Sequence, residues 1–393
     1  MKLIEEIQEQ LRLHAIQGWL LYDLHGSNEL AISIFRLPRD TLMTRRSFYW
    51  IPQRGLPVKI IHKIEEHNLD HLPGEKMIYL GWREMHRYLQ QLLNSCKRVA
   101  MEYSPYHSIP TISKVDGGLI DLIRSFGVEV VSSAPFLQLF TCVWKREHYL
   151  LHKEAAQVLD GTVHEAWKLI ISSLRNGKTL NEYDLQQFIL TQFAMKGCVT
   201  EGVPICGVNE HSADPHYIPQ KVGSKTIEEG DLVLIDVWCK RDLPDGVFAD
   251  ITRLGVLSPK PRPKHEKIFN IVADAQRVGI DLVRERYQNR QEVKGCEVDQ
   301  KVREVIVQAG YGPHFIHRTG HNIHTNTHGP GANLDSLETQ DDRLLMPRTC
   351  FSVEPGIYLP REFGMRLEND LYIHEDGRVE VTLPLQKELM TLT

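Results

Sequence analysis

Short apolar runs alternate with helical spacing over the first third of the chain. Residues 1–10 place apolar side chains on one face of a charged amphipathic helix, a pattern unlike that of a signal peptide. A second helical pattern lies near 117–126. The apolar runs predict strands at residues 16–22, 48–51, 58–61, 76–80, 97–103 and 128–131. Strands that alternate with helices predict an α/β domain with a mixed or parallel sheet.

Longer helical patterns begin at about residue 144 and indicate a second domain. The residue that caps the second of them is Thr179 or Asn181. The helices are predicted over residues 144–174, 181–197, 264–287 and 298–309. The remainder, from Gly310 onward, is predicted to be strand and loop. We therefore expect one domain over residues 1–143 and another over residues 144–393.

Composition narrows the class of protein. The 393 residues carry 46 basic and 51 acidic side chains, a net charge of −5, with no dense basic run, which excludes the electrostatic signature of nucleic-acid binding. No apolar run approaches the ~20 residues that a membrane helix needs. The seven cysteines contain no Cys-x-x-Cys pair. They favour reduced thiols and a cytoplasmic location over a disulfide framework or a cysteine-based zinc site.

Acidic residues interrupt apolar strand patterns at four places in the second domain. Asp236 closes an apolar run and Asp250 stands among β-branched and aromatic residues, while Glu354 and Glu368 lie in similar runs further on. Burying an unpaired carboxylate is costly, so each acid needs a partner. Taken singly, each acid also fits a turn after a strand. Four of them in such runs, with His321 between the two pairs, favour a metal site.

The spacing of these acids is compatible with one shared site. Asp236 and Asp250 are 14 residues apart, and so are Glu354 and Glu368. An even separation across two antiparallel strands is compatible with side chains on the same face. Four buried carboxylates need compensating positive charge, which a pair of divalent cations supplies. Oxygen ligands together with the imidazole of His321 suit Mn²⁺, Co²⁺, Fe²⁺ or Zn²⁺.

The segments that carry these four acids and His321, taken in their order along the chain, resemble the metal-ligand motifs of the pita-bread metallopeptidase family. That family includes methionine aminopeptidase, aminopeptidase P, prolidase and the creatinase-type amidinohydrolases. The resemblance covers about residues 146–393, while residues 1–143 resemble the creatinase/prolidase N-terminal domain in placement and texture. It implies an α/β N-terminal domain followed by an α+β pita-bread catalytic domain with a dinuclear metal centre. The implied metal ligands are Asp236, Asp250, His321, Glu354 and Glu368.

The resemblance also implies a role for each ligand. Asp250 and Glu368 would bridge two divalent ions, with Mn²⁺ the first candidate. Asp236 would serve one ion, and His321 with Glu354 would serve the other. A metal-bridging hydroxide is the implied nucleophile. Glu354 is the implied catalytic proton shuttle.

Three further histidines and one arginine match family positions. His216 resembles a catalytic histidine that faces the substrate. His328 resembles the catalytic histidine that hydrogen-bonds the scissile carbonyl or the tetrahedral intermediate. His317 and Arg366 are implied to bind substrate. His317 matches a pocket histidine of the proline-directed members, and Arg366 lies where it can order a carboxylate.

The chain departs from the family pattern at two places. Trp238 replaces a usual glycine, and the loop 239–246 that follows it is longer than usual. Arg318 introduces an arginine side chain near the pocket, between His317 and His321. These departures leave the metal ligands intact and bear on substrate preference, for which Trp238 or Tyr358 could form apolar walls.

The function that the resemblance implies is hydrolysis of Xaa-Pro bonds, by an aminopeptidase or a dipeptidase that acts on a peptide substrate. It also implies a homodimer, with no nucleic-acid or membrane partner. Two alternatives stay open. One is a creatinase-like, non-peptidase amide hydrolase on the same fold, and the other is a non-catalytic binding relative. All five ligands are present, and this counts against both.

Overall fold

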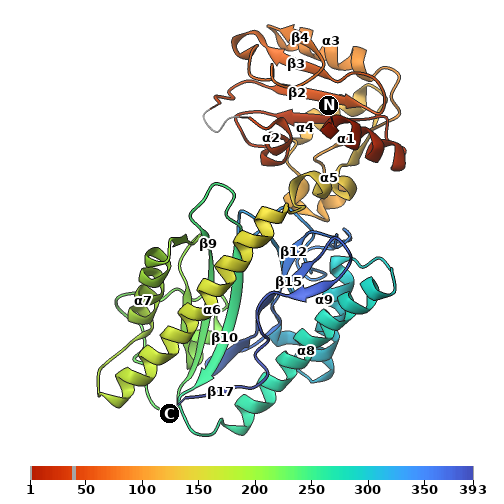
Figure 1. The fold of residues 1–393 in the computed structure, drawn as a ribbon. Coiled ribbons are helices and arrows are strands. Elements are labelled where there is room, and N and C mark those ends of the chain that lie inside the picture. The colour runs from red at the N-terminus through yellow and green to blue at the C-terminus, as the bar shows by residue number, and fades with distance from the viewer. Residues whose placement is uncertain (1, 38–40, 393) are drawn as a thin grey trace. The chain divides into compact units, whose positions relative to one another are not determined.

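A computed structural model describes residues 2–37 and 41–392 of the chain. The chain divides into two compact units, Met1–Thr141 and Cys142–Thr393, where the sequence placed a boundary near residue 143. Figure 1 shows both units and labels their elements where there is room. No helix in the described ranges is long and apolar enough to span a membrane.

The first unit is built on one mixed sheet with helices on both faces. Its strand order is β4 (Glu75–Tyr79), β3 (Val58–His62), β2 (Ser47–Pro52), β1 (Gly18–Asp23), β5 (Arg98–Met101), β6 (Glu129–Ser132). The pairs β1–β2 and β2–β3 are antiparallel, and the others are parallel. The helices are α1 (Lys2–Leu13), α2 (Glu29–Phe35), α3 (Trp82–Leu93), α4 (Gly117–Ser125) and α5 (Ala134–Thr141).

The central strand β1 shows why this sheet is covered on both sides. All six of its residues are buried. Trp19 and Leu21 join the core formed with α1, α2 and α5, whereas Leu20 and Tyr22 join the core formed with α3 and α4. Successive side chains of a strand point to opposite faces, so a continuous apolar run fits a sheet buried on both faces.

The second unit contains two sheets and a hairpin, each assembled from segments far apart in the chain. The first sheet has the order β17 (Met390–Thr391), β10 (Ala249–Val256), β9 (Leu232–Arg241), β7 (Cys198–Val199), and β8 (Ile205–Val208) also pairs with β9. The second sheet has the order β11 (Asn322–Ile323), β12 (Cys350–Val353), β15 (Asn369–Ile373), β16 (Val379–Val381). The separate hairpin is β13 (Gly356–Leu359) with β14 (Phe363–Arg366).

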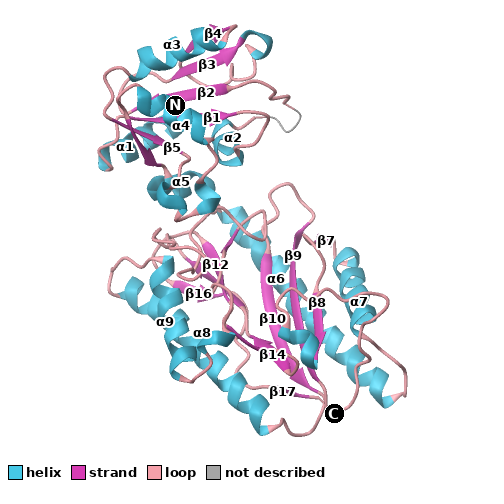
Figure 2. Cartoon of the chain, turned by 180° about the vertical axis from the view of Figure 1, so that it is seen from behind, coloured by secondary structure: helices cyan, strands magenta, loops and turns pink. Residues whose placement is uncertain are grey.

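Four long helices cover these sheets, as Figure 2 shows from behind. They are α6 (Arg146–Arg175), α7 (Glu182–Met195), α8 (Pro263–Gln288) and α9 (Gly295–Gln308). Each begins and ends within three residues of its predicted range. Asn181 is the N-cap of α7, because its side chain accepts a hydrogen bond from the Asp184 N–H. Helices α6 and α7 pack with the core of the first sheet, and α8 and α9 with that of the second.

The strand registers bring the predicted acids to one place. Asp236 of β9 lies opposite Thr252 of β10, so Asp250, two residues from Thr252, shares the face of Asp236. In the second sheet, β12 and β15 are antiparallel neighbours, and Glu354 and Glu368 lie directly beyond their paired ends. A single bridge pairs Thr252 with Glu368 and joins the two sheets. All four acids therefore meet where the sheets meet.

Candidate metal centre

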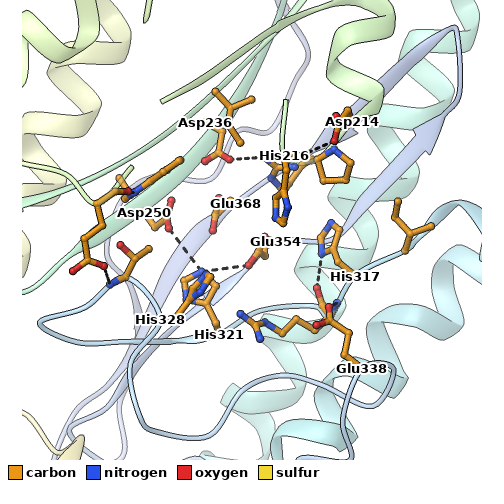
Figure 3. Close-up of a pocket in the computed structure, with 18 of the residues that line it drawn as sticks. Asp214, His216, Asp236, Asp250, His317, His321, His328, Glu338, Glu354 and Glu368 are labelled. Carbon is orange, nitrogen blue, oxygen red and sulfur yellow. Dashed lines mark hydrogen bonds and ion pairs between the residues drawn. The ribbon is translucent and has the colours of Figure 1, made fainter. Parts of the chain in front are cut away.

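A cavity of about 970 Å³ opens between the two sheets and is lined by every predicted site residue. Figure 3 shows the labelled acids and histidines pointing into it from separate segments. The nine predicted residues in its wall are His216, Asp236, Asp250, His317, His321, His328, Glu354, Arg366 and Glu368. The structure therefore brings the whole predicted set together.

Donor atoms converge at the centre of this cavity. One side-chain donor atom each from Asp250, His321 and Glu368 lie within 4.8 Å of one another. His321 Nε2 is 3.8 Å from Asp250 Oδ2 and 3.5 Å from Glu354 Oε1, as the dashed lines of Figure 3 mark. These separations are long for hydrogen bonds and leave space for an ion between the donors.

The carboxylates of this cluster carry a high electrostatic cost. Burial, followed by the charges of neighbouring carboxylates, raises the pKa of Asp250 and of Glu368 well above the ordinary values. Burial likewise raises the pKa of Glu354 to about 7, although Arg366 and Arg318 oppose the rise. The site therefore lacks positive charge, because two nearby guanidinium groups do not balance four buried acids.

Two observations show that the donor set fits divalent cations. Buried Oδ1 atoms of Asp236 and Asp250 have no hydrogen-bond partner among the described residues, and an unsatisfied buried oxygen of this kind is costly. Burial, followed by the charge of His328, lowers the pKa of His321 well below its usual value. His321 is therefore neutral, which is the form of imidazole that binds metals.

Arg366 organises the acids from behind. Its guanidinium is buried and forms an ion pair with Asp236, donates to the Tyr358 hydroxyl at 2.7 Å, and donates to Thr252 Oγ1 at 3.2 Å. Thr252 in turn donates to Glu368 Oε2 at 2.8 Å. Arg366 thus orders a carboxylate, that of Asp236, and its guanidinium is already occupied by these contacts.

His317 presents a ring whose two nitrogens are engaged inside the protein. Nδ1 lies 2.6 Å from the Arg318 carbonyl, which only accepts, so Nδ1 carries the hydrogen. Nε2 then accepts from the Tyr358 hydroxyl at 2.7 Å, and that hydroxyl accepts from Arg366. Burial lowers the pKa of His317 to about 3. The ring therefore offers its face rather than a polar atom to the cavity.

Tyr358 occupies a different place from the apolar wall suggested by the sequence. Its side chain is buried behind the cavity, its hydroxyl joins His317 to Arg366, and it is absent from the cavity lining. Trp238 does line the cavity. Its indole N–H donates to the carbonyl of Glu201, whose carboxylate accepts the Thr327 N–H at 3.1 Å.

The ring of His328 lies against that of His321. The rings of His321 and His328 are 4.3 Å apart at 68°, an edge-to-face contact. Burial, followed by the charges of Arg318 and His216, lowers the pKa of His328 to about 4. His328 is therefore neutral near pH 7 and can donate one N–H into the cavity.

Several contributing residues had no signal in the sequence pattern. Thr252, Tyr358 and Glu201 act through hydrogen bonds to residues far away in the chain. Asp370 is also buried, and its Oδ2 accepts the backbone N–H of Asp250 at 2.8 Å. Thr252 and Asp370 each stand two residues after a predicted ligand, Asp250 and Glu368, and Tyr358 stands four residues after Glu354, but nothing in the pattern revealed the partners of these side chains.

These features define a class of proteins with a carboxylate-rich candidate metal centre. Comparison with known proteins identifies the family. The model of metallopeptidase family M24 matches residues 151–375, more than half of the chain. The chain belongs to this family, and the predicted pita-bread resemblance is confirmed.

Individual relatives agree with this assignment. The chain is 30% identical over 257 residues to a putative dipeptidase, YkvY, of Bacillus subtilis, covering 65% of this chain and 64% of that one. It is also 30% identical over 217 residues to an Xaa-Pro dipeptidase of Lactobacillus helveticus. That match covers 54% of this chain and 53% of the dipeptidase. The matched region thus spans less than two thirds of the length of these curated relatives.

Solved structures share the fold at lower identity. Dipeptidase PepE from Mycobacterium ulcerans superposes with a TM-score of 0.69 at 20% identity, over 99% of this chain and 96% of that one. A second structure is an X-prolyl aminopeptidase from Caenorhabditis elegans, described as a cytosolic enzyme with a di-nuclear active site. It superposes with a TM-score of 0.64 at 17% identity, over 98% of this chain and 62% of that one. The predicted fold class, an α/β domain followed by a pita-bread domain, is confirmed.

The Tyr358 hydroxyl generates a prediction about stability. Tyr358→Phe leaves His317 Nε2 and one Arg366 N–H without a partner, so the free energy of unfolding should fall by about 1–3 kcal/mol. Urea denaturation of the metal-free protein measures this. Tyr311→Phe is the control, because no hydrogen bond to the Tyr311 hydroxyl is seen within the described residues, and it should change stability by less than about 0.5 kcal/mol. Equal effects of the two variants would contradict the assigned role.

Proposed function

We propose that this protein is a metal-dependent peptidase that hydrolyses Xaa-Pro bonds at the N-terminus of a peptide or in a dipeptide. The observation that carries the proposal is the convergence of Asp250, Glu368 and a neutral His321 in a cavity that two further carboxylates also line, with two carboxylate oxygens left unpartnered. The family and the printed names of two relatives, dipeptidase and Xaa-Pro dipeptidase, support it.

The family resemblance supports an assignment of the metal ligands. Asp250 and Glu368 would each bridge two divalent ions, Asp236 would complete one site, and His321 with Glu354 the other. Mn²⁺ is our first candidate, and Co²⁺, Fe²⁺ or Zn²⁺ suit the same oxygen and nitrogen donors. When bound, such ions lower the pKa of water and polarise a carbonyl, which supplies a nucleophile at neutral pH.

The chain's own residues would move protons and bind the developing charge. Glu354 accepts the proton released as water attacks and passes it to the leaving proline nitrogen. His328 donates its N–H to the oxygen that gains charge in the transition state. His216, at the exposed edge of the cavity, contacts the substrate.

Recognition of proline must work without an N–H, because an Xaa-Pro amide nitrogen carries none. The pocket therefore has to select the shape of the ring. His317 suits this task, because its nitrogens are engaged by Arg318 and Tyr358 and its flat face is free to pack against an apolar ring. Ile316 and Trp238 add apolar surface to the same cavity.

The alternatives remain distinguishable from this proposal. A creatinase-like amide hydrolase would turn over non-proline amides better than Xaa-Pro peptides, and a binding relative would turn over neither. The complete ligand set favours a metal-loaded enzyme over both. A peptide-library cleavage assay with added Mn²⁺ decides among them. The homodimer and the cytoplasmic location stay predictions.

The bridging role of Asp250 predicts the metal content of a variant. Asp250→Ala should lose both ions, because one bridging carboxylate serves each of them. Elemental analysis of the purified variant measures this. Asp214→Ala is the matched control, since Asp214 lines the same cavity outside the ligand set and its variant should retain both ions. If Asp250→Ala still binds two ions per chain, Asp250 is not a bridging ligand.

The role of His328 predicts a kinetic defect without metal loss. His328→Ala should keep its metal and lose turnover by about 10²–10³-fold, the scale of a lost oxyanion donor. Metal content and kcat are measured on the same preparation. Loss of metal, with normal kcat once metal is restored, would show that His328 is a ligand instead.

Specificity for proline is tested by two matched substrates. The value of kcat/KM for an Ala-Pro peptide should exceed that for the corresponding Ala-Ala peptide by at least about tenfold, or ~1.4 kcal/mol of transition-state discrimination. Both substrates are assayed at the same metal loading. A smaller ratio would mean that the pocket, reshaped around Trp238 and Arg318, selects another amide.

A further inference from the structure

A single buried carboxylate outside the cavity holds the loop that carries His216. Glu182 is the first residue of α7, its side chain is 0% exposed, and it does not line the cavity. The loop it holds runs from β8 to residue 225 and includes the 3₁₀ helix η4 (Asn209–Ala213). Asp214 and His216 of this loop line the cavity.

Among the described residues, every hydrogen bond to the Glu182 carboxylate comes from this loop or its two ends. The Val208 N–H donates to Oε1 at 2.8 Å, and the Lys225 N–H donates to Oε2 at 2.8 Å. The Tyr217 hydroxyl donates to Oε2 at 2.7 Å, and His211 Nδ1 lies 2.9 Å from both oxygens. One carboxylate thus fixes the beginning, the middle and the end of the segment.

The chemistry of these contacts requires a carboxylate. An ionised glutamate only accepts hydrogen bonds and offers about four lone-pair positions, which four donors fill here. Burial and the Glu182 carboxylate raise the pKa of Tyr217, so its hydroxyl keeps the donated proton. The rings of His211 and Tyr217 also lie against each other, with centroids 4.5 Å apart. The loop is therefore held in one arrangement.

A second attachment fixes the same loop to the β13–β14 hairpin, which carries Arg366. Ser212 Oγ donates to the Gly364 carbonyl at 3.0 Å and accepts the Gly364 N–H at 2.9 Å. Gly364 lies in β14, two residues before Arg366. The loop is thus attached to both α7 and β14, through Glu182 and through Gly364.

We propose that Glu182 is a positioning residue that sets where His216 stands in the substrate cavity. The proposal rests on the proposed function, in which His216 contacts the substrate. Glu182 itself touches neither substrate nor metal. It acts by fixing the loop on both sides of His216, so that the imidazole meets the substrate without first having to be ordered.

Glu182→Gln tests this with minimal change of shape. The amide replaces one acceptor oxygen by an NH₂ group, which then faces protein donors whichever way it is turned. We expect unchanged metal content and a fall in kcat/KM for an Ala-Pro peptide on the order of 10–100-fold, the scale of a misplaced contact group. In the His216→Ala background, the same substitution should lower kcat/KM by less than about threefold, because the group it positions is gone.

Glu380→Gln provides the matched control. Glu380 also accepts hydrogen bonds from a tyrosine, a lysine and a histidine, namely Tyr149, Lys153 and His374, but lies outside the cavity lining. Its effect on kcat/KM should be small and the same with or without His216. If Glu182→Gln behaves as this control does, with equal losses in both backgrounds, Glu182 has only a structural role and the proposal is overturned.

Two further outcomes separate the proposal from the function on which it rests. If His216→Ala alone leaves kcat/KM unchanged, the role of His216 in the proposed function fails. If Glu182→Gln does not fold, Tyr217→Phe replaces it, since it removes one of the four donors and keeps the carboxylate. Tyr217→Phe should show a smaller loss that likewise disappears in His216→Ala, and a loss that persists there would overturn the proposal.

Discussion

Four carboxylates line one cavity, where each makes the ionisation of the others more costly. The rest of the second unit is arranged around this cost. Arg366 pairs with Asp236, and Arg253 donates from its buried guanidinium to the backbone carbonyl of Glu368. These cations reduce the imbalance and leave oxygens of two aspartates unpartnered. The remaining deficit of positive charge is what divalent cations, when bound, would balance.

Strand pairing, rather than any single motif, holds the acids at their close separation. The antiparallel pair β9–β10 carries two of them, and the pair β12–β15 ends beside the other two. A strand ladder resists local displacement because moving one residue disturbs the hydrogen bonds of its neighbours. The Thr252 to Glu368 bridge then connects the two pairs. Rigid placement of this kind is what a repelling cluster requires in the absence of its counter-ions.

The sequence predicted the parts of this site that depend on periodicity and chemical type. Acids within apolar strand patterns are anomalous wherever they occur, so Asp236 and Asp250 could be singled out without coordinates. The hydrogen bonds of Tyr358 and Glu182 could not be predicted, because each joins residues dozens of positions apart whose meeting depends on tertiary packing. Tyr358 looked like an apolar wall for the same reason. Its ring is apolar, and nothing nearby in the chain revealed the partners of its hydroxyl.

The connection between β9 and β10 has a consequence for how this lineage can diversify. Asp236 and Asp250 are fixed by ladder pairs, whereas residues 242–248 form the tip of the hairpin beyond the last pair, Cys239 with Ala249. Chain added at the tip lengthens the loop without shifting the register of the acids. Insertions there are therefore nearly neutral for the metal site, while Trp238, which is paired with Asp250 inside the ladder, lines the cavity. The length of the hairpin tip can thus vary in evolution independently of the acids of the candidate metal centre.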